Sequence, residues 1–264
     1  MPYKGIIATV GGFISESAVG AGYTLGLLGR TGAYLWSAAR PRQFRETLHQ
    51  MYVCGIASIP VTMVVSIFTG AILALNGGLT LSELGQENLL GGIVAVSMTR
   101  EMGPFMTALI LAASVGSGMA AELGTMKVSE EIDALEVMGI DPAKFLVVPR
   151  LIAMAVMTPV VTVYTNLLGI LGGALISHFQ YGLNLTLFKT DALEDLNTKD
   201  IYTGLLKAFI FGTVIAVVSC SQGLRAQGGA IGVGYAVRRS VVVSYLLIII
   251  LGYYVTYFFY RFTW

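Results

Sequence analysis

Arg100 and Glu101 are neighbouring ionisable residues in a stretch that is otherwise apolar, and the following run from Met102 to Ala121 contains no Asp, Glu, Lys or Arg. A charge at membrane depth costs about 2.5–3.5 kcal/mol even on lenient scales, so it needs a partner or a function. We therefore expect both residues to face protein or water and not lipid. Successive helical residues point about 100° apart, so we expect them not to pair with each other.

A second group of functional residues lies in the acidic stretch 129–139, SEEIDALEVMG. Ser129 is expected to cap a short helix with acids in its first turn, and Gly139 and Pro142 end it. A helix of about nine residues is unstable alone, so its apolar face must be covered. A lipid surface is one possible cover. Because the polar face holds acids and no base, a partner protein is favoured, with these docking residues: Glu130, Glu131, Ile132, Asp133, Leu135, Glu136 and Met138.

Sequence motifs for catalysis, metals and nucleotides are missing. The chain contains no GxxxxGK[ST] loop, HExxH or GxSxG motif, and His49 and His178 are its only histidines. Cys54 and Cys220 have no zinc-site spacing and are interpreted as packed thiols. A net charge of +1 without a basic block argues against nucleic acid. We therefore predict no catalytic residue, metal or cofactor in this chain.

The elements that position these residues are predicted to be membrane helices. The chain has 264 residues, of which 55% are hydrophobic and 12% charged, whereas soluble domains have about a quarter charged residues. Long uncharged runs meet the length of about 20 residues that a membrane helix needs. We predict an all-α membrane protein with one domain, 1–264, and five membrane helices: 50–75, 89–121, 151–180, 201–221 and 240–260.

Several local features refine this prediction. Pro60 is expected to bend the first membrane helix, and glycines such as Gly70 and Gly169 to let helices pack closely. A continuous helix over 89–121 is about 50 Å long and exceeds the bilayer core of about 30 Å. Either it projects from the membrane, or Gly103-Pro104 divides it.

The amino-terminal segment 1–48 permits two interpretations. Residues 5–29 are long enough to span a membrane, but they contain six glycines at positions 11, 12, 20, 22, 26 and 29, together with Glu16. A segment lying in the membrane interface is favoured over a sixth span. The basic residues that follow, with Tyr34 and Trp36, fit an interfacial anchor.

The distribution of Lys and Arg predicts the orientation. Eleven lie in segments expected on the inner side, including a loop over 223–234 with Arg225, Arg238 and Arg239. Three or four lie outside, the uncertain one being Lys207, and the outer loop is expected to hold Asp200 in solvent. Because positive residues favour the cytoplasmic side, the amino terminus is expected inside and the carboxyl terminus outside.

The run MTREMGPFMTALILAASVGSGMAAELGTMKVSEEIDALEVMGIDP, residues 98–142, resembles the signature of the MlaE/YrbE permease family. The resemblance implies a membrane subunit of an ABC system that moves phospholipid or another hydrophobic molecule in the bacterial inner membrane. It also implies a homodimer, two cytoplasmic ATPase subunits that use ATP and magnesium, and an Mce-domain hexamer on the outer side. The amino-terminal segment is then an interfacial elbow, the helix over 129–139 couples to the ATPase, and the carboxyl terminus is periplasmic.

The same resemblance implies a lipid cavity between two copies of the chain, near the outer ends of the first two membrane helices. The residues of this sequence that it points to are Leu73, Thr80, Leu81, Leu84, Arg100, Glu101 and Met102. In such a cavity Arg100 is expected to pair with a phosphate. The alternative is that the two charged residues form purely structural ion pairs at the seam between the copies. Two other classes stay open, namely a non-transporting anchor for Mce proteins and a channel or secondary carrier. Dependence on nucleotide distinguishes a permease of an ABC transporter from both.

Overall fold

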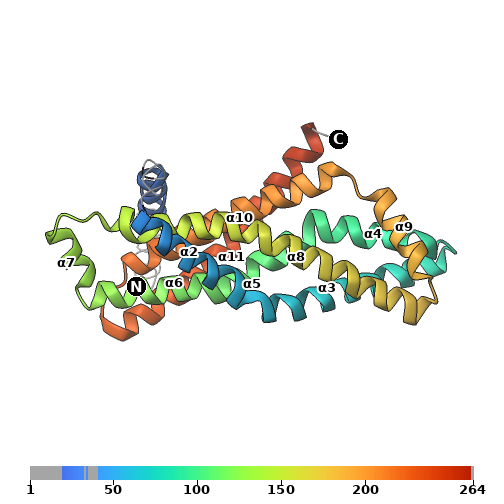
Figure 1. Ribbon diagram of the computed structural model, residues 1–264, viewed down its shortest axis with the longest axis horizontal. Helices are drawn as coiled ribbons and strands as arrows, with labels where there is room; N and C mark the ends of the chain where they lie inside the picture. The colour runs from blue at the N-terminus through green and yellow to red at the C-terminus, as the bar shows by residue number, and fades with distance from the viewer. Residues whose placement is uncertain (1–19, 33, 35–40, 263–264) are drawn as a thin grey trace, which may run out of the picture.

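Five long helical runs lie side by side along the length of the protein (Figure 1). The computed structural model describes residues 20–32, 34 and 41–262. Within these residues there is no strand, and five runs are long and apolar enough to cross a membrane. The prediction of an all-α membrane protein with five membrane helices is therefore confirmed. The runs are Phe44–Glu83, Glu87–Val128, Ala143–Tyr181, Thr198–Leu224 and Gly229–Arg261.

The first run consists of α2 (Pro41–Gly55), the 3-10 turn η2 (Ile56–Ser58) and α3 (Ile59–Glu83). Pro60 lies in the first turn of α3, where the missing N–H costs least. A 3-10 turn lies just before Pro60, in the region where the bend was predicted. The run extends beyond the predicted segment 50–75 at both ends.

The second run is continuous through Gly103 and Pro104, so these residues do not divide it. It comprises η3 (Glu87–Leu89), α4 (Leu90–Ser97), the π turn η4 (Met98–Met102), α5 (Gly103–Leu111), the π turn η5 (Ala112–Gly116) and α6 (Ser117–Val128). Its 42 residues correspond to about 63 Å, about twice the thickness of a bilayer core. The alternative in which the helix projects from the membrane fits this length.

The last three runs are longer than the segments predicted for them. They are the π turn η6 (Ala143–Val147) with α8 (Val148–Tyr181), α10 (Thr198–Leu224) and α11 (Gly229–Phe262). Arg238 and Arg239 were predicted to belong to an inner loop together with residues 223–234. Because α11 begins at Gly229, they lie within a helix instead. The loop predicted after Tyr181 contains a further helix, α9 (Leu185–Asp195).

Glycine permits the closest helix contact in the bundle, between α3 and α8. A Cβ at Gly70 would overlap the carbonyl oxygen of Gly169, and one at Gly172 would overlap the carbonyl oxygen of Ile67. The two backbones therefore touch without side chains between them, which is how membrane helices commonly associate. The predicted close packing at these glycines is confirmed.

The bundle has two distinct ends, which we call the α7 end and the α9 end (Figure 1). At the α7 end, α7 (Glu131–Val137) follows α6, and the helix over residues 20–32 is held there by an Arg30–Asp141 ion pair of 3.1 Å. At the α9 end, the backbone N–H of Gly92 donates to Asp191 at 2.7 Å. The final turns of α11 lie away from the α7 end. Residues 1–19 of the predicted interfacial segment lie outside the described residues.

Candidate functional site

One face of α10 is built to contact the second membrane run. Asp200, Gly204 and Lys207 follow one another at spacings of four and three residues, so they share a helix face. A Cβ at Gly204 would overlap the carbonyl oxygen of Thr99. Because glycine leaves that space free, α10 lies against η4 with its acid on one side of the contact and its lysine on the other.

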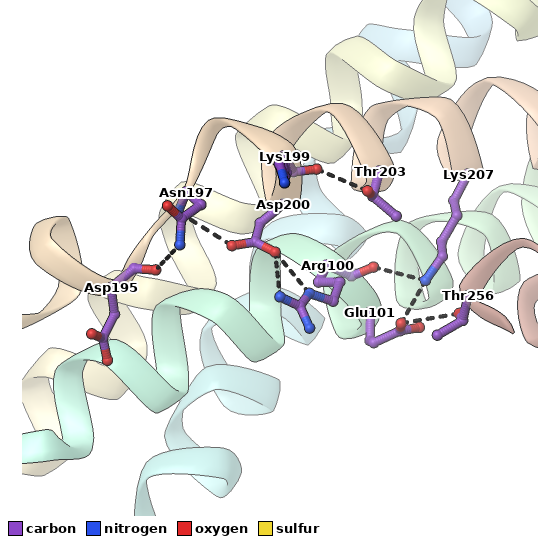
Figure 2. Close-up of polar contacts among 9 residues, drawn as sticks. All are labelled: Arg100, Glu101, Asp195, Asn197, Lys199, Asp200, Thr203, Lys207 and Thr256. Atoms are coloured by element: carbon purple, nitrogen blue, oxygen red, sulfur yellow. Dashed lines mark hydrogen bonds and ion pairs between the residues drawn. The ribbon is translucent and has the colours of Figure 1, made fainter. Parts of the chain in front are cut away.

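Asp200 pairs with Arg100 through two hydrogen bonds to one carboxylate oxygen (Figure 2). The Arg100 Nε lies 2.8 Å and its Nη2 2.5 Å from Asp200 Oδ1. The other oxygen, Oδ2, accepts from the backbone N–H of Asn197 at 3.2 Å, as part of the capping box that begins α10. Both oxygens of the buried carboxylate are therefore satisfied.

Lys207 pairs with Glu101 on the other side of the same helix contact (Figure 2). Its Nζ lies 2.5 Å from Glu101 Oε1 and also donates to the carbonyl oxygen of Arg100 at 3.1 Å. Thr256 of α11 donates to the same Glu101 oxygen at 3.1 Å. Glu101 thus connects three of the five runs.

In each of the two ion pairs, one side chain is buried and the other is partly exposed. The side chains of Asp200 and Lys207 are each 1% exposed, whereas those of Arg100 and Glu101 are 31% and 40% exposed. The four charges sum to zero, which limits the cost of holding them at membrane depth. The α10 residues are therefore internal counter-charges, and the η4 residues present one cation and one anion to the surface.

The π turn helps two adjacent residues to reach the same helix. Met98–Met102 form η4, in which each turn contains more residues than in an α-helix. Successive side chains consequently diverge by less than the about 100° of an α-helix. Arg100 and Glu101 each reach a different residue of α10, and π turns of this kind are frequent at functional sites.

The apolar residues predicted for the lipid cavity divide into two groups. Leu73, Leu81 and Met102 belong to one cluster near the α9 end, packed with Leu90 and Met98. Thr80 and Leu84 instead lie on the surface, Leu84 with 66% of its area exposed. The structure therefore brings three of these five residues together.

One expectation about the charged residues at this site was wrong. Asp200 was expected in solvent, yet it is buried, as is Lys207. The roles of Gly204 and Thr256 were not predicted. The signal available in the sequence was the spacing of Asp200, Gly204 and Lys207 on one face of an apolar helix.

The short acidic helix exists but begins later than predicted. It spans Glu131–Val137 and not 129–139, and Ser129 does not cap it. Ser129 ends α6 instead and donates its hydroxyl to the carbonyl oxygen of Thr125 at 2.8 Å. Glu130 precedes α7 with φ 62°, while Gly139 follows it with φ 75°, the left-handed conformation expected there.

The apolar face of α7 is covered by its own chain. Ile132 is only 2% exposed and packs with Leu123, Leu146 and Leu224, and Leu135 lies against the same cluster. The expectation that this face requires a partner is therefore wrong for Ile132. Several of the residues predicted to dock a partner lie on the outer surface instead: Glu130, Glu131, Asp133, Glu136 and Met138.

The fold and the buried ion pairs define a polytopic helical membrane protein with charged residues at a helix contact inside its membrane runs. A family model described as Permease MlaE matches residues 47–258, so the chain belongs to the MlaE permease family. It is the permease of an ABC transporter, and such a permease implies an ATPase partner. The predicted family is confirmed.

Curated relatives match most of the chain. A probable ABC transporter permease protein of Rickettsia typhi is 38% identical over 209 residues, which cover 79% of this chain and 81% of the relative. One of Synechocystis is 37% identical, covering 80% and 81%. The chloroplastic protein TRIGALACTOSYLDIACYLGLYCEROL 1 of Arabidopsis thaliana is 35% identical, covering 83% of this chain and 62% of the relative.

Proposed function

We propose that this permease moves phospholipid, or a similar hydrophobic molecule, between the bacterial inner membrane and an Mce-domain protein, driven by a separate ATPase subunit. The observation that carries the proposal is the pair of partly exposed charges, Arg100 and Glu101, on an apolar membrane run with buried counter-charges. Two further supports are the family and the lipid in the name of the Arabidopsis relative.

Arg100 and Glu101 contact the polar end of the lipid in this proposal. The Arg100 side chain is 31% exposed, and a guanidinium recognises phosphate well. Leu73 and Met102, which are partly buried, and the exposed Leu84 provide apolar surface for acyl chains on the side towards α9. The exposed Thr80 adds a hydroxyl, whereas Leu81 is only 8% exposed and packs inside the cluster. A charged residue next to an apolar surface is the combination that an amphiphile requires.

The assembly in the proposal contains two copies of the permease, two cytoplasmic ATPase subunits that bind ATP and magnesium, and an Mce hexamer. The α7 end faces the cytoplasm and the α9 end faces the periplasm. One support is the Lys and Arg distribution. The other is that the described residues contain five runs, and this odd number leaves the start of the first run on the side of the α7 end and the carboxyl end of α11 away from it (Figure 1). The amino terminus is then cytoplasmic and the carboxyl terminus periplasmic.

The ATPase docks on the outer surface of α7 in this proposal. Because Ile132 and Leu135 pack inward, the exposed apolar anchors are Val137 and Met138, which are 89% and 65% exposed. Glu130, Glu131 and Glu136 add negative charge to this exposed surface, while Asp133 is paired with Lys127. A partner surface with an apolar pocket and basic residues at its edge fits this arrangement.

Lipid occupancy tests the headgroup contact. Arg100→Ala alone leaves the buried Asp200 without its partner, so the sharper variant is Arg100→Ala with Asp200→Ala. Loss of a charged hydrogen bond to phosphate costs about 1.5–3 kcal/mol, so we expect at least about tenfold less phospholipid bound. Mass spectrometry of lipid copurified with the intact assembly measures this amount.

The matched control is Arg30→Ala with Asp141→Ala, which removes an ion pair at the α7 end. It should leave lipid occupancy unchanged. Wild-type occupancy in the Arg100 and Asp200 double variant would contradict the headgroup contact. If that variant instead loses its dimeric state, the ion pairs are structural at the seam between the copies.

A further inference from the structure

Glu122 of α6 and Arg150 of α8 form an ion pair at the α7 end, outside the site described above. The Arg150 Nη2 lies 2.9 Å from Glu122 Oε2, and its Nη1 donates to the carbonyl oxygen of Leu146 at 2.8 Å. The stretch 123–149 between the two residues contains all of α7. The pair therefore closes the base of the segment that includes the short acidic helix.

The apolar contacts of α7 lead directly to this pair. Ile132 of α7 belongs to the same buried cluster as Leu123, the neighbour of Glu122, and Leu146, whose carbonyl Arg150 binds. Packed protein interiors have few voids and transmit displacement. A shift of α7 is therefore transmitted to the two helix ends that the ion pair holds together.

The two partners differ in their access to solvent. The Arg150 side chain is 8% exposed and that of Glu122 is 60% exposed. The buried Nε of Arg150 has no hydrogen-bond partner among the described residues. If Glu122 turns away it can regain water, whereas Arg150 would remain as an uncompensated buried charge. The arrangement in which Glu122 and Arg150 are paired is thus favoured. The pair breaks only when other contacts supply the free energy that this requires.

Glu122 also has space into which it can move. It lines a pocket of about 180 Å³ together with Gln50 of α2 and Gly118 of α6. A second, more open pocket is lined by Glu122, Thr125 and Arg150. Glu122 therefore borders two hollows along α6, which leave space beside its side chain.

We propose that the Glu122–Arg150 pair is the positioning contact that transmits movement of α7 to the second and third membrane runs. The inference rests on the proposed docking of the ATPase at α7. Neither residue is part of the exposed surface of α7, so breaking the pair leaves the ATPase bound. What is lost is the coupling between ATP hydrolysis and lipid movement.

Glu122→Gln tests the inference in the complete assembly with its ATPase, reconstituted in phospholipid vesicles. We expect unchanged ATPase copurification and basal hydrolysis, and at least tenfold less lipid moved per ATP hydrolysed. The matched control is Glu194→Gln, which neutralises an exposed acid on α9 and should leave all three quantities unchanged.

A second variant distinguishes a relay, in which the ion pair transmits movement of α7, from simple stabilisation of the fold by the pair. Glu122→Gln combined with Arg150→Met removes both charges, so no uncompensated charge remains, and such replacements are often neutral for stability. A merely stabilising pair predicts recovery of lipid moved per ATP, whereas the relay predicts that it stays low.

Three results would overturn the inference. They are wild-type coupling in Glu122→Gln, recovery of coupling in the double variant, and loss of the ATPase from both variants. Docking itself is tested by changing the exposed surface of α7, which leaves Glu122 and Arg150 in place. A failure of the docking proposal and a failure of the relay therefore give different results.

Discussion

Lys207 is a charged residue in the interior of the helix bundle, with 1% of its side chain exposed and Glu101 as its ionic partner. Asp200 is buried to the same extent, but its partner Arg100 is about one-third exposed. The two pairs therefore respond differently to removal of the acid. Without Glu101 the lysine charge cannot reach water, whereas without Asp200 the arginine is still partly hydrated.

Glu101→Gln is consequently expected to be the more destabilising of the two neutralising substitutions. Breaking a buried pair costs about 3–5 kcal/mol in the free energy of unfolding, and we expect Glu101→Gln to approach this range. Asp200→Asn should cost about 1–3 kcal/mol. Denaturant unfolding of the purified permease in detergent measures both losses.

Addition of Lys207→Met is the control for the buried charge. It should restore at least half of the stability lost in Glu101→Gln, because both charges are then absent. Equal losses in Glu101→Gln and Asp200→Asn, or no recovery with Lys207→Met, would show that uncompensated burial of Lys207 is not the dominant cost.

Arg100 and Glu101 were predictable from sequence because two adjacent charges interrupt an apolar run. Their partners were not, because Asp200 and Lys207 lie near the end of a predicted membrane helix, where charges commonly face solvent. Contact with η4 depends on Gly204, and the significance of one glycine among 32 appears only when its neighbour is known.

At the scale of the element, α7 illustrates how a short helix can be stabilised by its own chain. Seven residues are too few to form a stable helix alone, and the sequence argument assigned its apolar face to a partner. The structure instead packs Ile132 and Leu135 against α6, η6 and α10. Periodicity placed Ile132, Leu135 and Met138 on one face, yet Met138 is 65% exposed. The pattern also could not distinguish burial within the chain from burial against another protein.

Met138→Asp tests the docking proposed for the remaining exposed surface of α7. Burial of a methionine side chain contributes about 1.5–3 kcal/mol, so we expect at least about tenfold weaker binding of the ATPase with an intact permease. Leu135→Asp is a poorer test, since Leu135 packs on the chain's own core.

The matched control for Met138→Asp is Leu193→Asp, which places the same charge at a similarly exposed leucine of α9. It should leave ATPase copurification unchanged. The docking proposal is wrong if Met138→Asp retains a wild-type amount of ATPase, or if Leu193→Asp releases as much.

At the scale of the whole molecule, hydrophobicity and length identified the five membrane runs, because each contains an uncharged stretch long enough to span. Their ends were less predictable. Helices continue beyond the apolar stretches, as α11 does from Gly229, since an α-helix outside the hydrocarbon core tolerates charged residues. The helix α9 was also missed because its composition resembles that of a solvated loop.

The described residues of one copy leave large apolar side chains on the surface along most of the bundle, including Phe68, Ile72 and Leu171. Such a surface suits lipid, a second copy of the chain, or both. In the proposed function, two copies, with their ATPase subunits, use ATP to move a lipid past Arg100 and Glu101. Affinity for lipid alone does not distinguish this function from that of an anchor for Mce proteins.

The most direct test is lipid transfer as a function of nucleotide. The permease, its ATPase and its Mce partner are reconstituted in vesicles that contain labelled phospholipid, and label exchanged between vesicle and Mce protein is measured. We expect transfer to increase at least about tenfold with ATP and magnesium, and not with a non-hydrolysable analogue. Equal transfer with ATP, with the analogue and without nucleotide would contradict the account and favour a non-transporting anchor.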